Sequence, residues 1–235
     1  MEEQFSYLDR NVNLKQIELA IPFVADLSFE SQQKITSHFV TLSHPANQII
    51  LLENDWGGSV YFVLNGWVKI RTYNLDGKEV TLNIIGKGEI FGEMAALEKQ
   101  PRSTDAITLT ATTIGRIPAE NFVNLITTEP LAGIHLAKIM ARRLRQVNRR
   151  LQLREASSLS RVADAILFLV DGQGTEAAGM MEIPNLPHKE ISSLSGLARE
   201  TVTRVLTKLE KRGLIERDTD FLRIPDILAL ENAIG

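Results

Sequence analysis

The sequence predicts an α+β fold in three parts: an N-terminal antiparallel β-barrel of the jelly-roll type (double-stranded β-helix), a long helix and a C-terminal winged helix-turn-helix. Three observations support this prediction. Short β-like segments fill residues 47–118, an apolar stripe at helical spacing follows, and a helix–turn–helix pattern with a short ribbon lies near the end. We therefore expect the three parts to occupy residues 1–130, 131–170 and 171–235.

The composition of the 235-residue chain is that of an ordinary globular protein and excludes several kinds of chemistry. Hydrophobic residues make up 44% and the formal net charge is -3, so the chain as a whole has no basic field for nucleic acid. Cysteine is absent, which excludes disulfides, iron–sulfur clusters and cysteine-ligated zinc. The start, "MEEQFSYLDR", is no signal peptide, and the apolar runs are too short to span a bilayer. We expect a cytoplasmic protein with no membrane partner.

Residues 47–118 have the pattern of an antiparallel β structure. The segments "QIILLE", "SVYFVLNGWVKIRTYN", "EVTLNIIG" and "TLTATTIGRIP" are rich in β-branched and aromatic residues. Asn65-Gly66 and Asp76-Gly77 predict hairpins, because both central residues of a type I′ turn need positive φ. Many short strands at even spacing predict a sandwich or a barrel. Before them, "SFESQQKITSHF" (28–39) predicts a helix.

From about residue 119 to 170 the spacing becomes helical. Apolar residues recur at gaps of three or four on one face, and these are Leu136, Met140, Leu144, Val147 and Leu151. A narrow seam with arginine-rich flanks favours a partner helix, so we expect a homodimer; the alternative is a helix lying on its own domain. Seven Lys or Arg and no acid lie between Lys138 and Arg154. Arg143, Arg149 and Arg150 could reach a second anion, or could form a solvated flank.

The C-terminal segment has the order of a winged helix-turn-helix. After "VDGQGTEAAGMMEIPNLP" (170–187), which predicts a loop or linker, come "HKEISSL", a turn with Gly196, "RETVTRVLTKLEKRG" and "LIERDTDFLRIP". The second helix exposes Arg199, Glu200, Thr203 and Arg204 near its start. Arginine can bond guanine O6 and N7, and glutamate can accept from cytosine N4, so this helix is suited to reading double-stranded DNA.

The local charge of the same segment also favours DNA. Residues 187–217 contain seven Lys or Arg and four Glu, a net charge of +3 in an acidic protein. Lys189 and Lys208 are the candidates for phosphate contacts. Ala198 stands at the expected N-cap of the second helix, where it offers no side-chain acceptor, so a DNA phosphate or water would satisfy the free N–H.

Two stretches together resemble a known family. "FGEMAALEKQPRSTDA" (91–106) places a short helical piece within the β region and resembles the phosphate-binding cassette of the catabolite activator (cyclic AMP receptor protein) and FNR superfamily. "GLARETVTRVLTKLEKRGLIERD" resembles the helix-turn-helix of that superfamily, and the order of parts is also similar from about residue 20 to 225. The resemblance implies a homodimeric transcription activator with cyclic AMP as its effector, without metal, haem or Fe–S. Its partners would be a palindromic TGTGA-like DNA site and RNA polymerase.

The resemblance also implies a role for individual residues. Arg102 would pair with the cyclic phosphate, Ser103 would donate its hydroxyl to it, and Glu93 would accept from the ribose 2′-OH. Gly92 would let the backbone approach closely, with Met94 in the same cassette. On the long helix, Val147 and Asn148 align with the family's two adenine-reading residues. The Val147 side chain forms no hydrogen bonds, whereas Asn148 can both donate and accept.

Other functions stay open at this point. The effector could be 2-oxoglutarate, a cyclic dinucleotide, haem or none, and the four histidines show no haem-ligand pattern. The chain could be a cyclic-nucleotide module acting on a protein partner, which the helix-turn-helix disfavours. An enzyme built on Ser103, Asp105 and His135 is disfavoured because no nucleophile elbow frames them.

Overall fold

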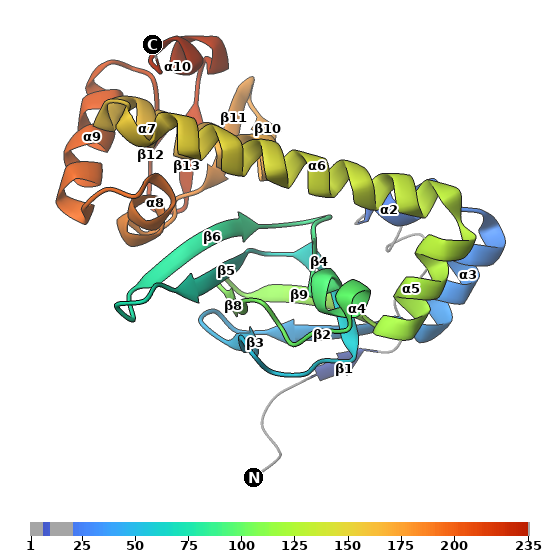
Figure 1. Ribbon diagram of the computed structural model, residues 1–235. Helices are drawn as coiled ribbons and strands as arrows, with labels where there is room; N and C mark the ends of the chain where they lie inside the picture. Colours follow the sequence, from blue (N-terminus) through green and yellow to red (C-terminus); the bar gives the residue numbers. More distant parts are fainter. Residues whose placement is uncertain (1–6, 10–20, 235) are drawn as a thin grey trace. The chain divides into compact units, whose positions relative to one another are not determined.

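The computed structural model describes residues 7–9 and 21–234 of the chain (Figure 1). The chain divides into two compact units, residues 1–141 and 142–235, which we term the N-terminal unit and the C-terminal unit. The longest helix, α6 (Pro130–Gln152), includes residues of both units. Of the helices described, none combines the length and the apolar character needed to cross a bilayer.

The β region of the N-terminal unit forms two antiparallel sheets with a buried apolar cluster that both sheets supply. The five-stranded sheet has the order β1 (Tyr7–Asp9), β2 (Val40–His44), β9 (Thr112–Pro118), β4 (Ser59–Asn65), β7 (Ile90–Phe91). The four-stranded sheet has the order β3 (Ile49–Leu51), β8 (Asp105–Thr108), β5 (Val68–Tyr73), β6 (Glu79–Ile85). The predicted jelly-roll fold is confirmed, and within the described residues it consists of two sheets rather than one closed barrel.

One of the two expected hairpins is wrong. Asp76-Gly77 lies between β5 and β6, which pair with each other, whereas Asn65-Gly66 connects β4 and β5, which belong to different sheets. Gly77 and Gly66 have φ of 73° and 85°, but Asp76 and Asn65 do not have positive φ, so neither turn is of type I′. The side chain of Asn74 holds the first turn instead, because its Oδ1 accepts from the Asp76 N–H at 3.0 Å.

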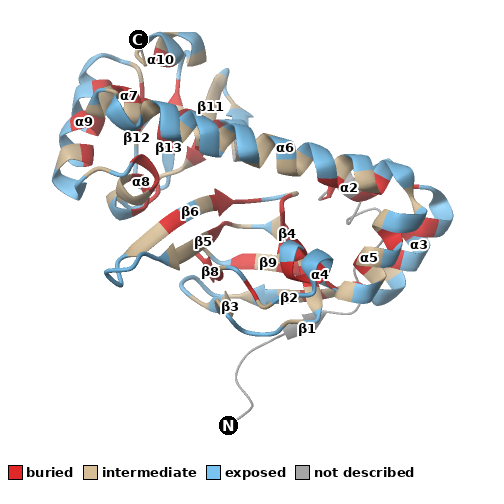
Figure 2. Cartoon of the chain, in the orientation of Figure 1, coloured by how far each residue is buried: buried red, intermediate tan, exposed pale blue. Residues whose placement is uncertain are grey.

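Helices cover one end of this β structure. They are α2 (Pro22–Ala25), α3 (Phe29–His38), α5 (Ala119–Thr128) and the start of α6. The helix expected at 28–39 is confirmed as α3, and Ser28 caps it by accepting from the Ser31 N–H at 3.3 Å. Phe62 of β4 and Phe122 of α5 lie in one core with Leu136 of α6, and all three are buried. Figure 2 shows that both strands and helices of the N-terminal unit contribute buried residues.

The C-terminal unit contains the predicted winged helix-turn-helix. After the end of α6 its elements are η1 (Leu153–Glu155), α7 (Ser158–Gln173), β10 (Thr175–Ala177), β11 (Met180–Pro184), α8 (His188–Ser195), α9 (Arg199–Lys211), β12 (Glu216–Arg217), β13 (Phe221–Ile224) and α10 (Ile227–Asn232). The helix pair α8–α9 and the β12–β13 ribbon are in the expected places. The final helix, α10, is an element that the sequence reasoning missed.

The structure differs from the sequence prediction at two places in this unit. The helical region does not continue unbroken to residue 170: it breaks after Gln152, and Ser157 starts α7 by accepting from the Ser160 N–H at 3.1 Å. Residues 170–187 are also not a plain linker. They contain the hairpin β10–β11, whose turn residues Ala178 and Gly179 both have positive φ, and β11 pairs with β13.

The central strand β9 offers a test of packing in the N-terminal unit. A Cβ on Gly115 would overlap the ring of Phe39, which covers it in the core, whereas a Cβ on Gly58 would meet open space. We expect Gly115→Ala to lower the free energy of unfolding by about 1–3 kcal/mol, because overpacking forces the ring or the strand to move. Denaturant unfolding measures the change, with Gly58→Ala as the control. Equal stability of the two variants would contradict the packing described here.

Candidate functional site

The short helix α4 (Glu93–Glu98) confirms the helical piece expected within residues 91–106. It starts from Gly92, which has φ of 78° and would place a Cβ 2.6 Å from Nη1 of Arg102. A side chain at this position would therefore collide with the guanidinium as well as strain the backbone. Glu93, the first residue of α4, is 3% exposed. The start of α4 thus brings a glycine, a buried carboxyl group and a buried arginine together.

Arg102 is the centre of this group. Its side chain is buried, Nη1 donates to the Gly92 carbonyl oxygen at 2.6 Å, and Nη2 donates to the Ser59 carbonyl oxygen at 2.7 Å. The buried Nε has no hydrogen-bond partner among the described residues. Burial lowers the pKa of Arg102, while Tyr61 and Glu93 act in the opposite direction.

The backbone of Arg102 is fixed from the other side by a loop before β4. The Arg102 N–H donates to the Asp55 carbonyl oxygen and the Asn54 N–H donates to the Arg102 carbonyl oxygen, both at 2.8 Å. Three residues further on, Asp105 accepts from the Glu53 N–H at 2.8 Å and from Nε of Arg71 at 3.0 Å. Sequence reasoning did not find this loop, because its contacts join segments about 50 residues apart.

The other cassette residues lie at the surface. Ser103 is exposed, with its Oγ 4.0 Å from Sδ of Met94, and Met94 is itself 46% exposed. The five predicted residues of the cassette are therefore close together, two of them buried and two accessible. Val147 and Asn148 lie in the C-terminal unit on an exposed part of α6. Their role in reading a base stays a prediction.

The predicted apolar seam of α6 has two different environments. Leu136 is 7% exposed and Met140 is partly buried, and both pack against the core of the N-terminal unit. Leu144, Val147 and Leu151 are 61%, 49% and 64% exposed. The first part of the seam thus lies on its own domain, which was the alternative interpretation of the sequence. The second part is a row of exposed apolar side chains on the outside of the helix.

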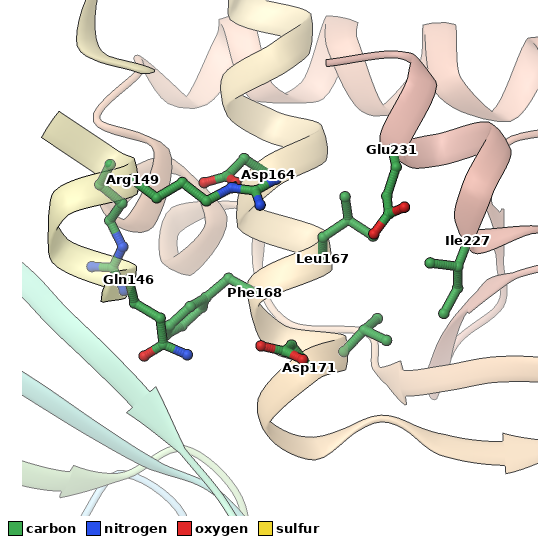
Figure 3. A pocket seen from close by; sticks show the side chains of 10 residues that line it. Gln146, Arg149, Asp164, Leu167, Phe168, Asp171, Ile227 and Glu231 are labelled. Carbon is green, nitrogen blue, oxygen red and sulfur yellow. The ribbon is translucent and has the colours of Figure 1, made fainter. Parts of the chain in front are cut away.

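The arginines near the end of α6 contact α7 of the same unit. Arg149 forms an ion pair with Asp164, and the Arg150 guanidinium lies 4.4 Å from the centre of the Phe168 ring. Burial lowers the pKa of Arg150, and Asp164 opposes this shift. Arg149 and Arg150 help to line a cavity of about 230 Å³, which Asp171 and Glu231 also border (Figure 3). Arg149 and Arg150 already have partners on α7. These contacts favour a structural role for the two side chains over a role in binding a second anion.

The helix-turn-helix is built as the sequence predicts. Gly196 ends α8 with φ of 64°, and Ala198 is the N-cap of α9 without a side-chain acceptor. Val202, Leu206 and Leu209 are fully buried on one side of α9. On the other side the structure exposes the four predicted base-reading residues, Arg199, Glu200, Thr203 and Arg204. The two predicted phosphate-contacting residues, Lys189 and Lys208, are also exposed.

A polar chain behind α9 was missed by the sequence reasoning. Nδ1 of His188 is 2.8 Å from Oγ1 of Thr203, and Nε2 is 2.7 Å from Nη1 of Arg217. Arg217 in turn donates to both carboxylate oxygens of Glu210, at 2.9 and 2.7 Å. The chain joins α8, α9 and the wing strand β12. Its members are 7 to 29 residues apart in sequence, so no local pattern indicated it.

Comparisons with known proteins agree with this architecture. Residues 41–129 match the model of the cyclic nucleotide-binding domain, and residues 160–233 match that of the Crp-like helix-turn-helix domain. The cyclic AMP receptor protein of Thermus thermophilus is 31% identical over 89% of this chain and 95% of its own length. A CRP-like cAMP-activated global transcriptional regulator of Mycobacterium tuberculosis is 29% identical over 82% and 87%. The structure of FixK2 from Bradyrhizobium japonicum has the same fold, with a TM-score of 0.71 and 22% identity over 83% and 96%.

A cyclic-nucleotide-binding domain joined to an exposed recognition helix defines a cyclic-nucleotide-binding transcription regulator. The chain belongs to the CRP–FNR family of these regulators. Its relatives are transcription regulators and not enzymes. Among the described residues, no group of three or more His, Asp or Glu is arranged to hold a metal ion.

Proposed function

We propose that cyclic AMP binds at the cassette and controls the binding of a homodimer of this chain to palindromic DNA. The observation that supports the ligand site best is the state of Arg102. Its guanidinium is buried, yet among the described residues it forms no ion pair with a carboxylate, and its Nε–H has no acceptor. A buried charge that forms no direct ion pair is costly by several kcal/mol. An anion that reaches this side chain would supply both the missing charge and the missing acceptor.

A cyclic nucleotide fits the surroundings of Arg102. The phosphate would pair with the guanidinium and accept from the hydroxyl of Ser103. Glu93 would accept from the ribose 2′-OH, and Gly57 and Gly92 leave the space around the guanidinium free of side chains. In this site the phosphate offsets the buried charge, while the ribose hydroxyl distinguishes a nucleotide from a simple anion.

The choice of cyclic AMP rests on the relatives. The proteins of T. thermophilus and M. tuberculosis are named for cyclic AMP, and Asn148 offers both a donor and an acceptor for the edge of a purine. Val147 is the weaker part of this proposal, because its side chain forms no hydrogen bonds. Cyclic GMP, 2-oxoglutarate and a cyclic dinucleotide are therefore the alternative ligands to be titrated in parallel.

Arg102→Leu tests the ligand site. We expect the variant to lose on the order of 2–4 kcal/mol of cyclic AMP binding, because the charge-assisted hydrogen bonds to the phosphate disappear. Isothermal titration calorimetry measures the affinity, and the exposed Arg116→Leu in β9 is a control with the same change of charge in the same unit. Unchanged affinity of Arg102→Leu would end the cassette hypothesis. If the wild type binds one of the three alternative ligands and does not bind cyclic AMP, that ligand takes the place of cyclic AMP as the proposed effector.

The homodimer rests on the exposed part of the α6 seam. Leu144, Val147 and Leu151 recur at gaps of three and four, so they form one apolar row along the helix. About half or more of each side chain is exposed. A second copy of the helix would bury these side chains in pairs, and a two-fold dimer would present two α9 helices to DNA. The recognition helices of such dimers lie about 34–36 Å apart, one turn of the double helix.

Leu144→Arg tests the dimer. We expect it to dissociate the dimer at micromolar concentration, because a guanidinium would be buried in an apolar seam without a partner. Sedimentation velocity measures the assembly state. Leu131→Arg, which changes an exposed apolar residue of the same helix outside the seam, should leave the dimer intact. If Leu144→Arg remains fully dimeric, the seam is not the interface.

The DNA site follows from the exposed face of α9. Arg199 and Arg204 would each bind a guanine, and Glu200 would accept from the cytosine opposite, in a TGTGA-like half-site with a palindromic partner. Lys189 and Lys208 would contact phosphates and add affinity without sequence preference. A regulator bound in this way near a promoter would contact RNA polymerase.

Arg204→Ala tests the reading of bases. We expect a loss of roughly 1–3 kcal/mol on the preferred site and a relaxed preference at one base pair of each half-site. Selection from random DNA followed by affinity measurement gives both quantities. Lys208→Ala is the control, because loss of a phosphate contact weakens all sequences alike and reduces the salt dependence. If Arg204→Ala binds all DNA sequences more weakly by the same factor and still selects the same bases, the proposal is contradicted.

A further inference from the structure

We infer that Thr203 reads DNA with its methyl group, because hydrogen bonds within the protein already engage its hydroxyl as a donor and as an acceptor. The inference rests on the proposed function, in which α9 enters the major groove. Thr203 is exposed on α9 between Arg199 and Arg204. Its hydroxyl lies 2.8 Å from Nδ1 of His188 and 3.0 Å from the carbonyl oxygen of Arg199.

The arginine of the wing decides which nitrogen of His188 holds the proton. Nη1 of Arg217 is 2.7 Å from Nε2 of His188. A guanidinium has only donors, so Nε2 must accept and the ring must be the neutral form protonated on Nδ1. Glu210 binds the same guanidinium through both carboxylate oxygens and keeps it in place. Burial and the charges of Arg217 and Arg199 lower the pKa of His188, against an opposing effect of Glu210, which agrees with a neutral ring.

The tautomer of His188 then fixes the role of the Thr203 hydroxyl. Nδ1–H donates to Oγ1, and the single hydroxyl proton of Thr203 goes to the Arg199 carbonyl oxygen four residues earlier. Thr203 therefore has no proton left for guanine O6 or N7, adenine N7 or thymine O4, and its one remaining lone pair can meet only a base donor such as adenine N6–H or cytosine N4–H. The methyl group has no such constraint. Its natural partner in the major groove is the C5-methyl group of thymine.

His188 is a positioning residue in this arrangement. It lies at the start of α8, and it acts through the rotamer of a side chain on the neighbouring helix. Without the Nδ1–H donor, only the bond to the Arg199 carbonyl oxygen holds this rotamer, and the hydroxyl can exchange that bond for a contact with DNA. A valine at position 203 has the same branched shape and needs no hydroxyl partner, so its reading of DNA would not depend on His188.

Thymine-to-uracil scanning tests the inference, because uracil lacks only the C5-methyl group. Each thymine of the sequence selected by the wild type is replaced in turn, and the affinity of the full-length protein is measured. At one thymine of each half-site we expect uracil to weaken the wild type and Thr203→Val about fourfold, the effect of leaving one methyl group without its apolar contact. Thr203→Ser, which keeps the hydroxyl and lacks the methyl, should bind the thymine and uracil sites equally.

The positioning role of His188 has its own readout. We expect His188→Ala to lose the discrimination between thymine and uracil at that position, and the double variant His188→Ala, Thr203→Val to regain it. If the His188 side chain only supports the fold, both variants should lose affinity for the thymine and uracil sites alike, and this result would overturn the positioning role of His188. If no thymine separates Thr203→Val from Thr203→Ser, the methyl contact is wrong while the proposed function stands. A wild type that selects no sequence would overturn the proposed function and the inference together.

Discussion

The two hydrogen bonds from the Arg102 guanidinium to the carbonyl oxygens of Gly92 and Ser59 join the start of α4 to the start of β4. A Cβ at Gly57 or Gly92 would collide with the guanidinium and force it out of this position. The loop before β4 holds the backbone of Arg102 from the other side through Asn54 and Asp55. The N-terminal unit thus buries a cation whose direct hydrogen-bond partners are neutral carbonyl groups, an arrangement that is stable only at a cost and that favours an anion.

The parts of the fold that the sequence predicted have local causes. Gly196 in the left-handed conformation, the apolar spacing of α9 and the short helix α4 are each determined by residues within one or two turns of the chain. The parts that could not be predicted depend on distant partners. Asn65-Gly66 has the composition of a hairpin turn, but β4 pairs with β9 instead of β5. The proton of His188 is placed by Arg217, 29 residues away.

The α6 helix shows why hydrophobic periodicity alone could not tell which surface covers its apolar face. Leu136, Met140, Leu144, Val147 and Leu151 have one continuous spacing, so the sequence pattern treats them as one seam. The structure buries Leu136 on the core of its own domain and leaves Leu144 and Leu151 exposed. Hydrophobic spacing identifies which side chains avoid water, but not what covers them. The cassette residues were found differently, through the resemblance of a short motif, and their burial could not be read from that motif.

The β10–β11 hairpin changes the character of the wing. Strand β13 forms hydrogen bonds with β11 on one edge and with β12 on the other, so the wing is part of a four-stranded sheet and not an isolated ribbon. The outer strands of this sheet, β10 and β12, are three and two residues long. Strands this short offer too few free N–H and carbonyl groups to recruit a further strand. The short outer strands thereby protect the winged sheet from edge-to-edge pairing with a sheet of another molecule.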